Sequence, residues 1–261
     1  MDSPSLASLS LTHVHYDPAD PISHACAYLA LVPQALVITY VALIWSTREV
    51  EILLMFAGQM GCEAFNWLLK RTIKEQRPPR AYIRIHIHFH AHPQTGQVIC
   101  SAEADEMHGK GYGMPSSHAQ FVAFFSAFLT LFLLFRHNPH HPHASSTHAP
   151  TPYWQRLSLA LLSMVSAGAV AQSRVYLYYH TPRQVYVGLL AGVLCAVAWF
   201  AVTSAARHWR WVDEALDTYL ARWLRLRDLV VNEDLVDAGW ERWELRRKRV
   251  MQQTGMKNKS T

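Results

Sequence analysis

Two histidines, three cations and two serines are grouped in this chain of 261 residues. Histidine exchanges a proton near neutral pH, whereas lysine, arginine and hydroxyl groups bind anions. The residues form three short groups, each beside an apolar stretch: Lys70-x6-Arg77-Pro78, Pro115-Ser116-Ser117-His118 and Ser173-Arg174-x5-His180. These residue types predict a phosphate site with proton-transfer chemistry.

The middle group has the composition of a helix N-terminus. Ser116 and Ser117 follow Pro115 and precede a run over 119–135 without Asp, Glu, Lys or Arg. Ser and Pro at a helix start leave backbone N–H groups free, and such a terminus is a ready phosphate site. The hydroxyls add donors, and His118 in the first turn could give a proton to a leaving oxygen.

The elements that must position these groups are long apolar helices. Hydrophobic residues make up 51% of the chain and charged residues only 16%, against about 25% charged in ordinary soluble proteins. A membrane span needs about 20 apolar residues. Suitable windows lie at approximately 25–46, 52–69, 119–135, 154–173 and 185–205. The sequence therefore predicts an all-α integral membrane protein, a helical bundle of about five transmembrane spans. A soluble all-α bundle is the alternative.

The distribution of basic residues predicts which face carries the three groups. With five spans, the N-terminus and the loops at 70–117 and 173–184 lie on one face, with nine of the 24 Lys and Arg residues. The other face holds the remaining fifteen. Because positive charge favours the cytoplasmic side, we expect a cytoplasmic tail and extracytoplasmic loops. All three groups then share one membrane surface.

The second span carries a polar face that ends at the first group. Its members, separated by four, three and four residues, are Gln59, Glu63, Asn66 and Lys70. An ionisable residue in a span is costly, so Glu63 is expected to face the bundle interior or a water-filled cavity. Alternatively, Glu63 and Asn66 only pair with neighbouring helices. Pro78 and Pro79 stop the helix, which places Arg77 at the membrane edge near Lys70.

Three regions follow from this layout. They are a polar N-terminal segment at 1–22, a polytopic membrane domain at 23–205 whose loops 70–117 and 173–184 carry the site, and a basic cytoplasmic tail at 206–261. Residues 1–22 lack the basic region of a signal peptide, so the first span would serve as the targeting signal. The tail begins with Trp, Leu and Val among Arg residues, which is typical of an interfacial amphipathic helix or of a short soluble one. Basic residues near the span ends favour lipid phosphates and membrane surfaces over nucleic acid.

Two histidine-rich stretches and four cysteines complete the candidates. Cys26, Cys62 and Cys195 lie inside spans and only Cys100 in a loop, so no disulfide framework is expected. Imidazole clusters can bind transition metals, but the composition favours solvated linkers without a ligand. The histidines concerned are His86, His88, His90, His92, His137, His140, His141, His143 and His148.

The three ordered groups resemble the signatures of the type 2 phosphatidic acid phosphatase superfamily. The surrounding words FNWLLKRTIKEQRP, YGMPSSHAQF and SRVYLYYHTPRQV are similar to those of dolichyl-diphosphatases of the endoplasmic reticulum. The resemblance, which covers 52 to about 200, implies that His180 attacks phosphorus to form a phosphohistidine and that His118 protonates the leaving group and then activates water. It implies that the phosphoryl oxygens are held by Lys70, Arg77, Ser116, Ser117 and Arg174.

One position departs from the superfamily pattern, because Gln184 stands where an Asp is expected four residues after His180. A Gln oxygen can accept the imidazole N–H and fix the tautomer, although it lacks a negative charge. The dolichyl-diphosphatase branch tends to have Gln there. The resemblance thus implies hydrolysis of dolichyl diphosphate to dolichyl phosphate and phosphate, on the lumenal side of the endoplasmic reticulum membrane, in the lipid cycle of protein N-glycosylation. No cofactor or metal is expected, since these groups lack a carboxylate cluster for Mg²⁺. The alternatives are another lipid phosphate or pyrophosphate phosphatase and a non-enzymatic transporter or scaffold.

Overall fold

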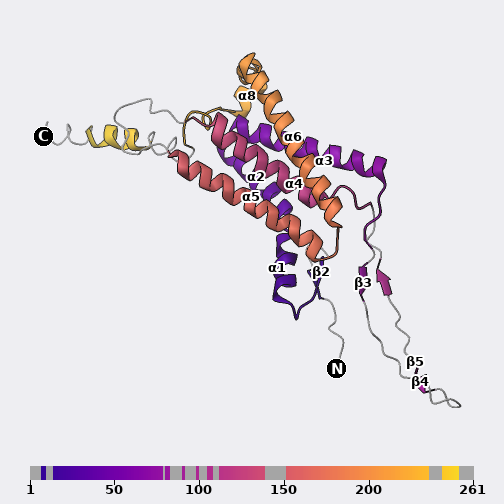
Figure 1. Ribbon diagram of the computed structural model, residues 1–261. Coiled ribbons are helices and arrows are strands. Elements are labelled where there is room, and N and C mark those ends of the chain that lie inside the picture. The colour runs from indigo at the N-terminus through magenta and orange to yellow at the C-terminus, as the bar shows by residue number, and fades with distance from the viewer. Residues whose placement is uncertain are drawn as a thin grey trace. The chain divides into compact units, whose positions relative to one another are not determined.

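The computed structural model describes residues 7–9, 14–78, 80–82, 90–91, 98–99, 105–107, 112–138, 151–234 and 243–252 (Figure 1). Long helices account for most of the described chain. They are α1 (Pro21–Leu29), α2 (Val32–Thr47), α3 (Val50–Ile73), α4 (Ser117–Leu131), α5 (Tyr153–Tyr176) and α6 (Pro182–His208). A five-residue π-helical turn, Phe132–Arg136, follows α4 directly. The predicted all-helical membrane class is confirmed.

Short elements make up the remainder. Three antiparallel strand pairs join β1 (Ala7–Leu9) to β2 (Val14–Tyr16), β3 (Arg80–Tyr82) to β6 (Asp105–Met107), and β4 (His90–Ala91) to β5 (Val98–Ile99). The first part of the tail forms two short helices, α7 (Trp211–Leu216) and α8 (Tyr219–Leu224). Residues 243–252 are also helical.

Four stretches of the described chain are long and apolar enough to cross a membrane: Pro21–Thr47, Val50–Ile73, Ser117–Arg136 and Pro182–His208. They coincide with four of the five predicted windows. The fifth window is also a helix, the 24-residue α5. It carries Gln155, Arg156, Gln172 and Arg174 near its two ends and is not among the four stretches above.

Local chemistry explains where these helices begin and end. The Asp20 carboxylate caps α1 by accepting hydrogen bonds from the backbone N–H groups of Ile22 and Ser23, at 2.9 and 3.1 Å. Pro33 near the start of α2 has no N–H to continue α1, so the chain breaks between the two helices. At the end of α3, Lys74 adopts a left-handed conformation with φ 53°. This turn ends the helix and redirects the chain toward Arg77.

The chain divides into two compact units. The first comprises Met1–Ala35, Gly61–Phe124 and Ser166–Val193. Among the described residues, its apolar core includes clusters built around Ala27 and Leu177, Ala119 and Val185, and Val122 and Val170. All eight predicted site residues belong to this unit.

The second unit comprises Leu36–Met60, Phe125–Val165 and Leu194–Thr261. Aromatic contacts such as Phe128 on Phe200, with ring centroids 5.8 Å apart, contribute to its core. Glu51 accepts from Arg136 at 2.5 Å and from Arg207 at 2.6 Å, so two guanidinium groups neutralise one buried carboxylate. The carboxylate of Glu49 binds the backbone N–H groups of Leu229 and Val230, which ties the tail segment to the start of α3.

Candidate active site

His180 and Gln184 form a hydrogen-bonded pair in the first unit. His180 lies between α5 and α6 and is 4% exposed, whereas Gln184 lies in the first turn of α6 and is fully buried. The Nδ1 atom of His180 is 3.2 Å from Oε1 of Gln184. Because an amide oxygen only accepts hydrogen bonds, Nδ1 carries the proton, and Nε2 keeps its lone pair. A neutral histidine in this tautomer can act as a nucleophile through Nε2.

The orientation of the Gln184 amide is fixed by the turn after α3. Its Nε2 atom donates to Oε1 of Glu75 at 2.9 Å and to the carbonyl oxygen of Gln76 at 2.8 Å. Both partners are acceptors, so the amide nitrogen must face them and the amide oxygen must face His180. Glu75 is not among the site residues predicted from the sequence. Its position two residues before Arg77, inside the first group, was the sequence feature that could have indicated a role in the site.

The start of α4 packs against the start of α6. Ser116 is fully buried, and its backbone N–H donates to the carbonyl oxygen of Gln184 at 3.1 Å. Its hydroxyl has no hydrogen-bond partner among the described residues. The Ser117 hydroxyl accepts from Nζ of Lys70 at 3.3 Å. Two of the three sequence groups therefore meet at this helix start, with a buried donor available to a ligand.

Arg174 packs against the loop that carries Tyr179 and His180. Its side chain is nearly buried, at 3% exposure, and its guanidinium carbon lies 4.4 Å from the centre of the Tyr179 ring. The Arg174 carbonyl accepts the backbone N–H of His180 at 3.2 Å. The Tyr179 hydroxyl in turn accepts the backbone N–H of His15 at 2.9 Å. The N-terminal segment thus supports the ring on which Arg174 rests.

His118 contacts the break between α1 and α2. Its Nε2 atom lies 3.2 Å from the carbonyl oxygen of Ala30. Since a carbonyl can only accept, Nε2 carries a proton, and Nδ1 is left as the second ring nitrogen for proton exchange. Lys70, Arg77 and Arg174 are close enough to interact electrostatically with His118. The structure therefore places both predicted histidines near the same three cations.

The electrostatic environment favours an uncharged His180. Burial lowers the pKa of His180 to about 3, and the positive charges of Arg77, Arg174 and Lys70 act in the same direction. Concentrated positive charge is unfavourable in an empty site and favourable around a bound anion. The arrangement suits a phosphate group.

Two residues on the polar face of α3 have different partners. Asn66 Nδ2 donates to Oε1 of Gln120 at 2.6 Å, and Gln120 Nε2 donates to the carbonyl oxygen of Cys62 at 3.0 Å. Asn66 therefore pairs with a neighbouring helix, as expected under the alternative in which this residue only holds the bundle together. Glu63 is half-buried and interacts electrostatically with Lys70.

Some of the other predicted candidates lie outside the described residues or apart from the site. Cys100, His86, His88, His92 and the histidines at 140–148 are not described. His137 belongs to the second unit, where its ring nitrogens lie 2.7 Å from the Val230 carbonyl oxygen and 3.0 Å from Asp234 Oδ1. Cys26, Cys62 and Cys195, the described cysteines, form no disulfide.

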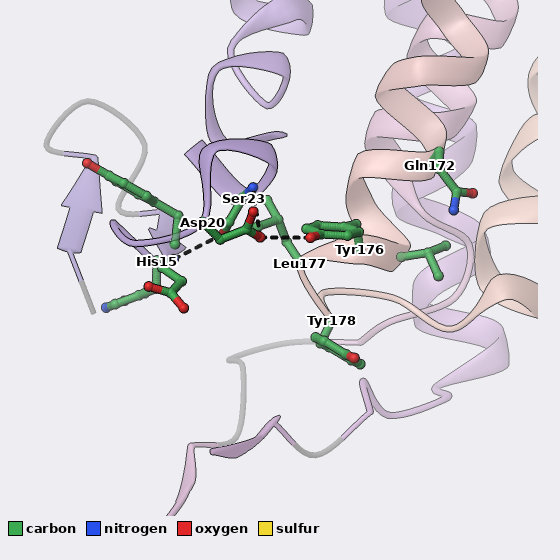
Figure 2. Close-up of a pocket in the computed structure, with 10 residues that line it drawn as sticks. His15, Asp20, Ser23, Gln172, Tyr176, Leu177 and Tyr178 are labelled. Carbon is green, nitrogen blue, oxygen red and sulfur yellow. Dashed lines mark hydrogen bonds between the residues drawn. The ribbon is translucent and has the colours of Figure 1, made fainter. Parts of the chain in front are cut away.

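A cavity of about 540 Å³ is lined on one side by segment 15–23 and on the other by segment 172–178 (Figure 2). Figure 2 shows the Tyr176 ring directed at Asp20, whose Oδ2 accepts the Tyr176 hydroxyl at 2.7 Å. None of the eight predicted site residues lines this cavity. Its walls join β2 and α1 to the end of α5, and this contact supports the loop that carries Tyr179 and His180.

Comparison with known proteins identifies the family. The model of the PAP2 superfamily matches residues 48–208, a range that contains all eight predicted site residues. The chain belongs to the PAP2 superfamily. The resemblance drawn from the three sequence groups is thereby confirmed, and the protein is a multi-pass membrane phosphatase.

Individual relatives place the chain among the dolichyldiphosphatases of this superfamily. It is 47% identical to a candidate dolichyldiphosphatase of Neurospora crassa, with 93% of each chain covered. It is 37% identical to dolichyldiphosphatase 1 of Homo sapiens, over 75% of this chain and 71% of the relative. It is 28% identical to a dolichyldiphosphatase of Saccharomyces cerevisiae, over 87% and 82% of the two chains. No solved structure matches the chain.

Proposed function

We propose that this protein removes the terminal phosphate of dolichyl diphosphate and releases dolichyl phosphate and inorganic phosphate. The observation that carries the proposal is the 3.2 Å contact between His180 Nδ1 and Gln184 Oε1 beside three cations. It leaves a neutral Nε2 nucleophile where positive charge can hold a phosphoryl group. The names of the relatives support dolichyl diphosphate as the substrate.

The cradle for the terminal phosphoryl group consists of Lys70, Arg77, Ser116, Ser117 and Arg174. The buried Ser116 hydroxyl and the start of α4 supply hydrogen-bond donors, and the cations neutralise the charge on the equatorial oxygens. Phosphoryl transfer needs positioning and charge neutralisation more than covalent assistance. Fixed cations can provide both.

The reaction proceeds in two displacements. In the first, His180 Nε2 forms a bond to the terminal phosphorus while the bond from phosphorus to the bridging oxygen breaks. His118, doubly protonated in the substrate complex, gives its Nδ1 proton to that oxygen and keeps the Nε2 proton on the Ala30 carbonyl, and dolichyl phosphate leaves. In the second, His118 takes a proton from water, the water oxygen bonds to phosphorus, and the N–P bond breaks to release phosphate and restore His180.

The site is proposed to face the lumen of the endoplasmic reticulum, with the tail at 206–261 in the cytoplasm. The excess of Lys and Arg on the tail side supports this orientation. Dolichyl phosphate released there would return to the lipid cycle of protein N-glycosylation. The tail carries an acceptor sequence, Asn258-Lys259-Ser260, which should stay unglycosylated. A new acceptor introduced within 92–97 should be glycosylated, and the reverse pattern would contradict the orientation.

Phosphate release from dolichyl diphosphate tests the activity. Purified protein in detergent with excess EDTA should release phosphate, and His180→Ala should abolish the release. His208→Ala, which alters an exposed histidine of the second unit, should match wild type. Diacylglycerol pyrophosphate and farnesyl diphosphate should be poorer substrates. Faster turnover of either lipid would reassign the substrate, and undiminished release by His180→Ala would overturn the mechanism.

A further inference from the structure

Glu75 is a carboxylate that faces the partner of the proposed nucleophile. Its Oε1 atom accepts Nε2–H of Gln184 at 2.9 Å, and Oε1 of the same amide lies 3.2 Å from His180 Nδ1. A continuous chain of two hydrogen bonds therefore joins the carboxylate to the imidazole. Hydrogen bonds in such a chain polarise one another.

We propose that Glu75 is a positioning residue that transmits negative charge to His180 through the Gln184 amide. The inference rests on the proposed function. A carboxylate drawing on the amide N–H makes the amide oxygen a stronger acceptor for the imidazole proton. Gln184 itself carries no charge. Glu75 therefore supplies the negative charge that an Asp at position 184 would otherwise provide.

The backbone of the turn after α3 fixes the position of Glu75. Lys74 adopts φ 53°, and its backbone N–H donates to the carbonyl oxygen of Lys70 at 3.1 Å. The Glu75 carbonyl accepts the backbone N–H of Gly113 at 2.7 Å. A side chain at Gly113 would begin 2.8 Å from Nε2 of Gln184, so glycine lets the chain close over the amide. The three segments that meet here come from the turn after α3, the residues before α4, and α6.

Charge at this position matters because His180 becomes cationic as its Nε2 bonds to phosphorus. Lys70, Arg77 and Arg174 interact electrostatically with His180 and oppose that positive charge. A carboxylate two hydrogen bonds away offsets part of this repulsion without touching the phosphoryl group. Glu75 should therefore affect the chemical step more than substrate binding.

The decisive variant is Glu75→Gln, which keeps the size and an acceptor oxygen but removes the charge. On dolichyl diphosphate it should lower kcat about tenfold with little change in KM or in inhibition by inorganic phosphate. Glu214→Gln makes the same chemical change on the exposed face of α7 and should behave as wild type. A kcat for Glu75→Gln within twofold of wild type would overturn the inference.

A charge exchange provides a readout that a merely structural residue would not change. Gln184→Glu places two carboxylates in contact and should be slow because one must take up a proton or move away. Combining it with Glu75→Gln leaves one carboxylate directly on Nδ1 of His180. The double variant should turn over faster than Gln184→Glu alone, whereas multiplicative losses would contradict charge transmission.

Failure of the substrate assignment is separable from failure of this inference. Wild type that releases no phosphate from dolichyl diphosphate would overturn the proposed function. Normal wild-type turnover together with an unimpaired Glu75→Gln variant would overturn only the role of Glu75.

Discussion

Gly188 of α6 lies directly against the backbone of Ser116 at the start of α4. A Cβ atom on Gly188 would be 2.7 Å from the Ser116 carbonyl oxygen. One turn later, a Cβ on Gly192 would be 2.4 Å from the carbonyl oxygen of Gln120. Small residues four apart let two membrane helices approach closely. This contact positions the proposed phosphate cradle relative to His180.

Gly188→Ala should therefore damage both stability and activity. The added methyl group meets backbone, which can relieve the clash only by moving α4 away from α6, at a cost of about 1–3 kcal/mol. Thermal unfolding in detergent should show a lower midpoint, and kcat/KM should fall because Ser116 shifts. Gly168→Ala on α5 has open space around the new methyl group and serves as the control. Equal midpoints for the two variants would refute the close-packing explanation.

Removing the Ser116 hydroxyl should weaken substrate binding without lowering the stability of the protein. The hydroxyl is buried without a partner among the described residues, so Ser116→Ala loses no protein hydrogen bond that the structure shows. The unfolding midpoint should stay the same or rise, while KM for the lipid diphosphate should rise about threefold to tenfold if the hydroxyl contacts phosphate. Ser163→Ala removes a hydroxyl that donates to the Ala160 carbonyl and should leave KM unchanged. A lower midpoint without a change in KM would contradict a role in binding.

Arg174 should depend on the ring of Tyr179. Tyr179→Leu removes the aromatic face 4.4 Å from the guanidinium carbon, whereas Tyr179→Phe keeps the face and loses only the hydroxyl bonded to His15. Inorganic phosphate should inhibit Tyr179→Leu about tenfold more weakly, since a buried cation–π contact contributes about 1–2 kcal/mol. Tyr179→Phe should lose less. Comparable inhibition of the two variants would show that the ring does not hold Arg174.

The low pKa of His180 predicts how stability depends on pH. Burial and the surrounding cations set the pKa to about 3 in the folded protein, whereas a free histidine titrates near 6.5. Between these values the unfolded chain binds more protons than the folded protein. Stability is therefore lost as pH falls from about 6.5 toward 3, by up to about 1.4 kcal/mol per pH unit.

His180→Gln removes this titration and should lose less stability than wild type between pH 6.5 and pH 4. Denaturant unfolding in detergent at several pH values measures the difference. His208→Gln, an exposed change, controls for the loss of a histidine. Parallel pH curves for wild type and His180→Gln would contradict a buried neutral His180.

The sequence contained most of the site because its residues lie in three short groups. His180 precedes the start of α6 and Gln184 lies four residues later in its first turn, while Lys70 lies near the end of α3, so local spacing alone brings such residues to defined positions. The apolar windows predicted the helices for a similar reason. A span of this length in lipid has to satisfy its backbone internally.

The missed features depend on contacts between distant segments. The Ala30 carbonyl reaches His118 across 88 residues, and His15 reaches Tyr179 across 164. A backbone carbonyl or N–H leaves no trace in residue identity, so motif spacing could not reveal either contact. Glu75 was visible, but only the fold shows that its carboxylate meets Gln184. Gly188 likewise became informative only when α4 was found beside it.

The phosphohistidine mechanism is tested most directly by trapping the phosphorylated enzyme. Dolichyl diphosphate labelled at the terminal phosphorus should be mixed with excess protein and quenched in base within one turnover. A phosphohistidine at His180 predicts an acid-labile, base-stable label on the peptide that contains this residue, present in wild type and absent from His180→Ala. Phosphate release by wild type without any labelled peptide, or with the label on another residue, would contradict it.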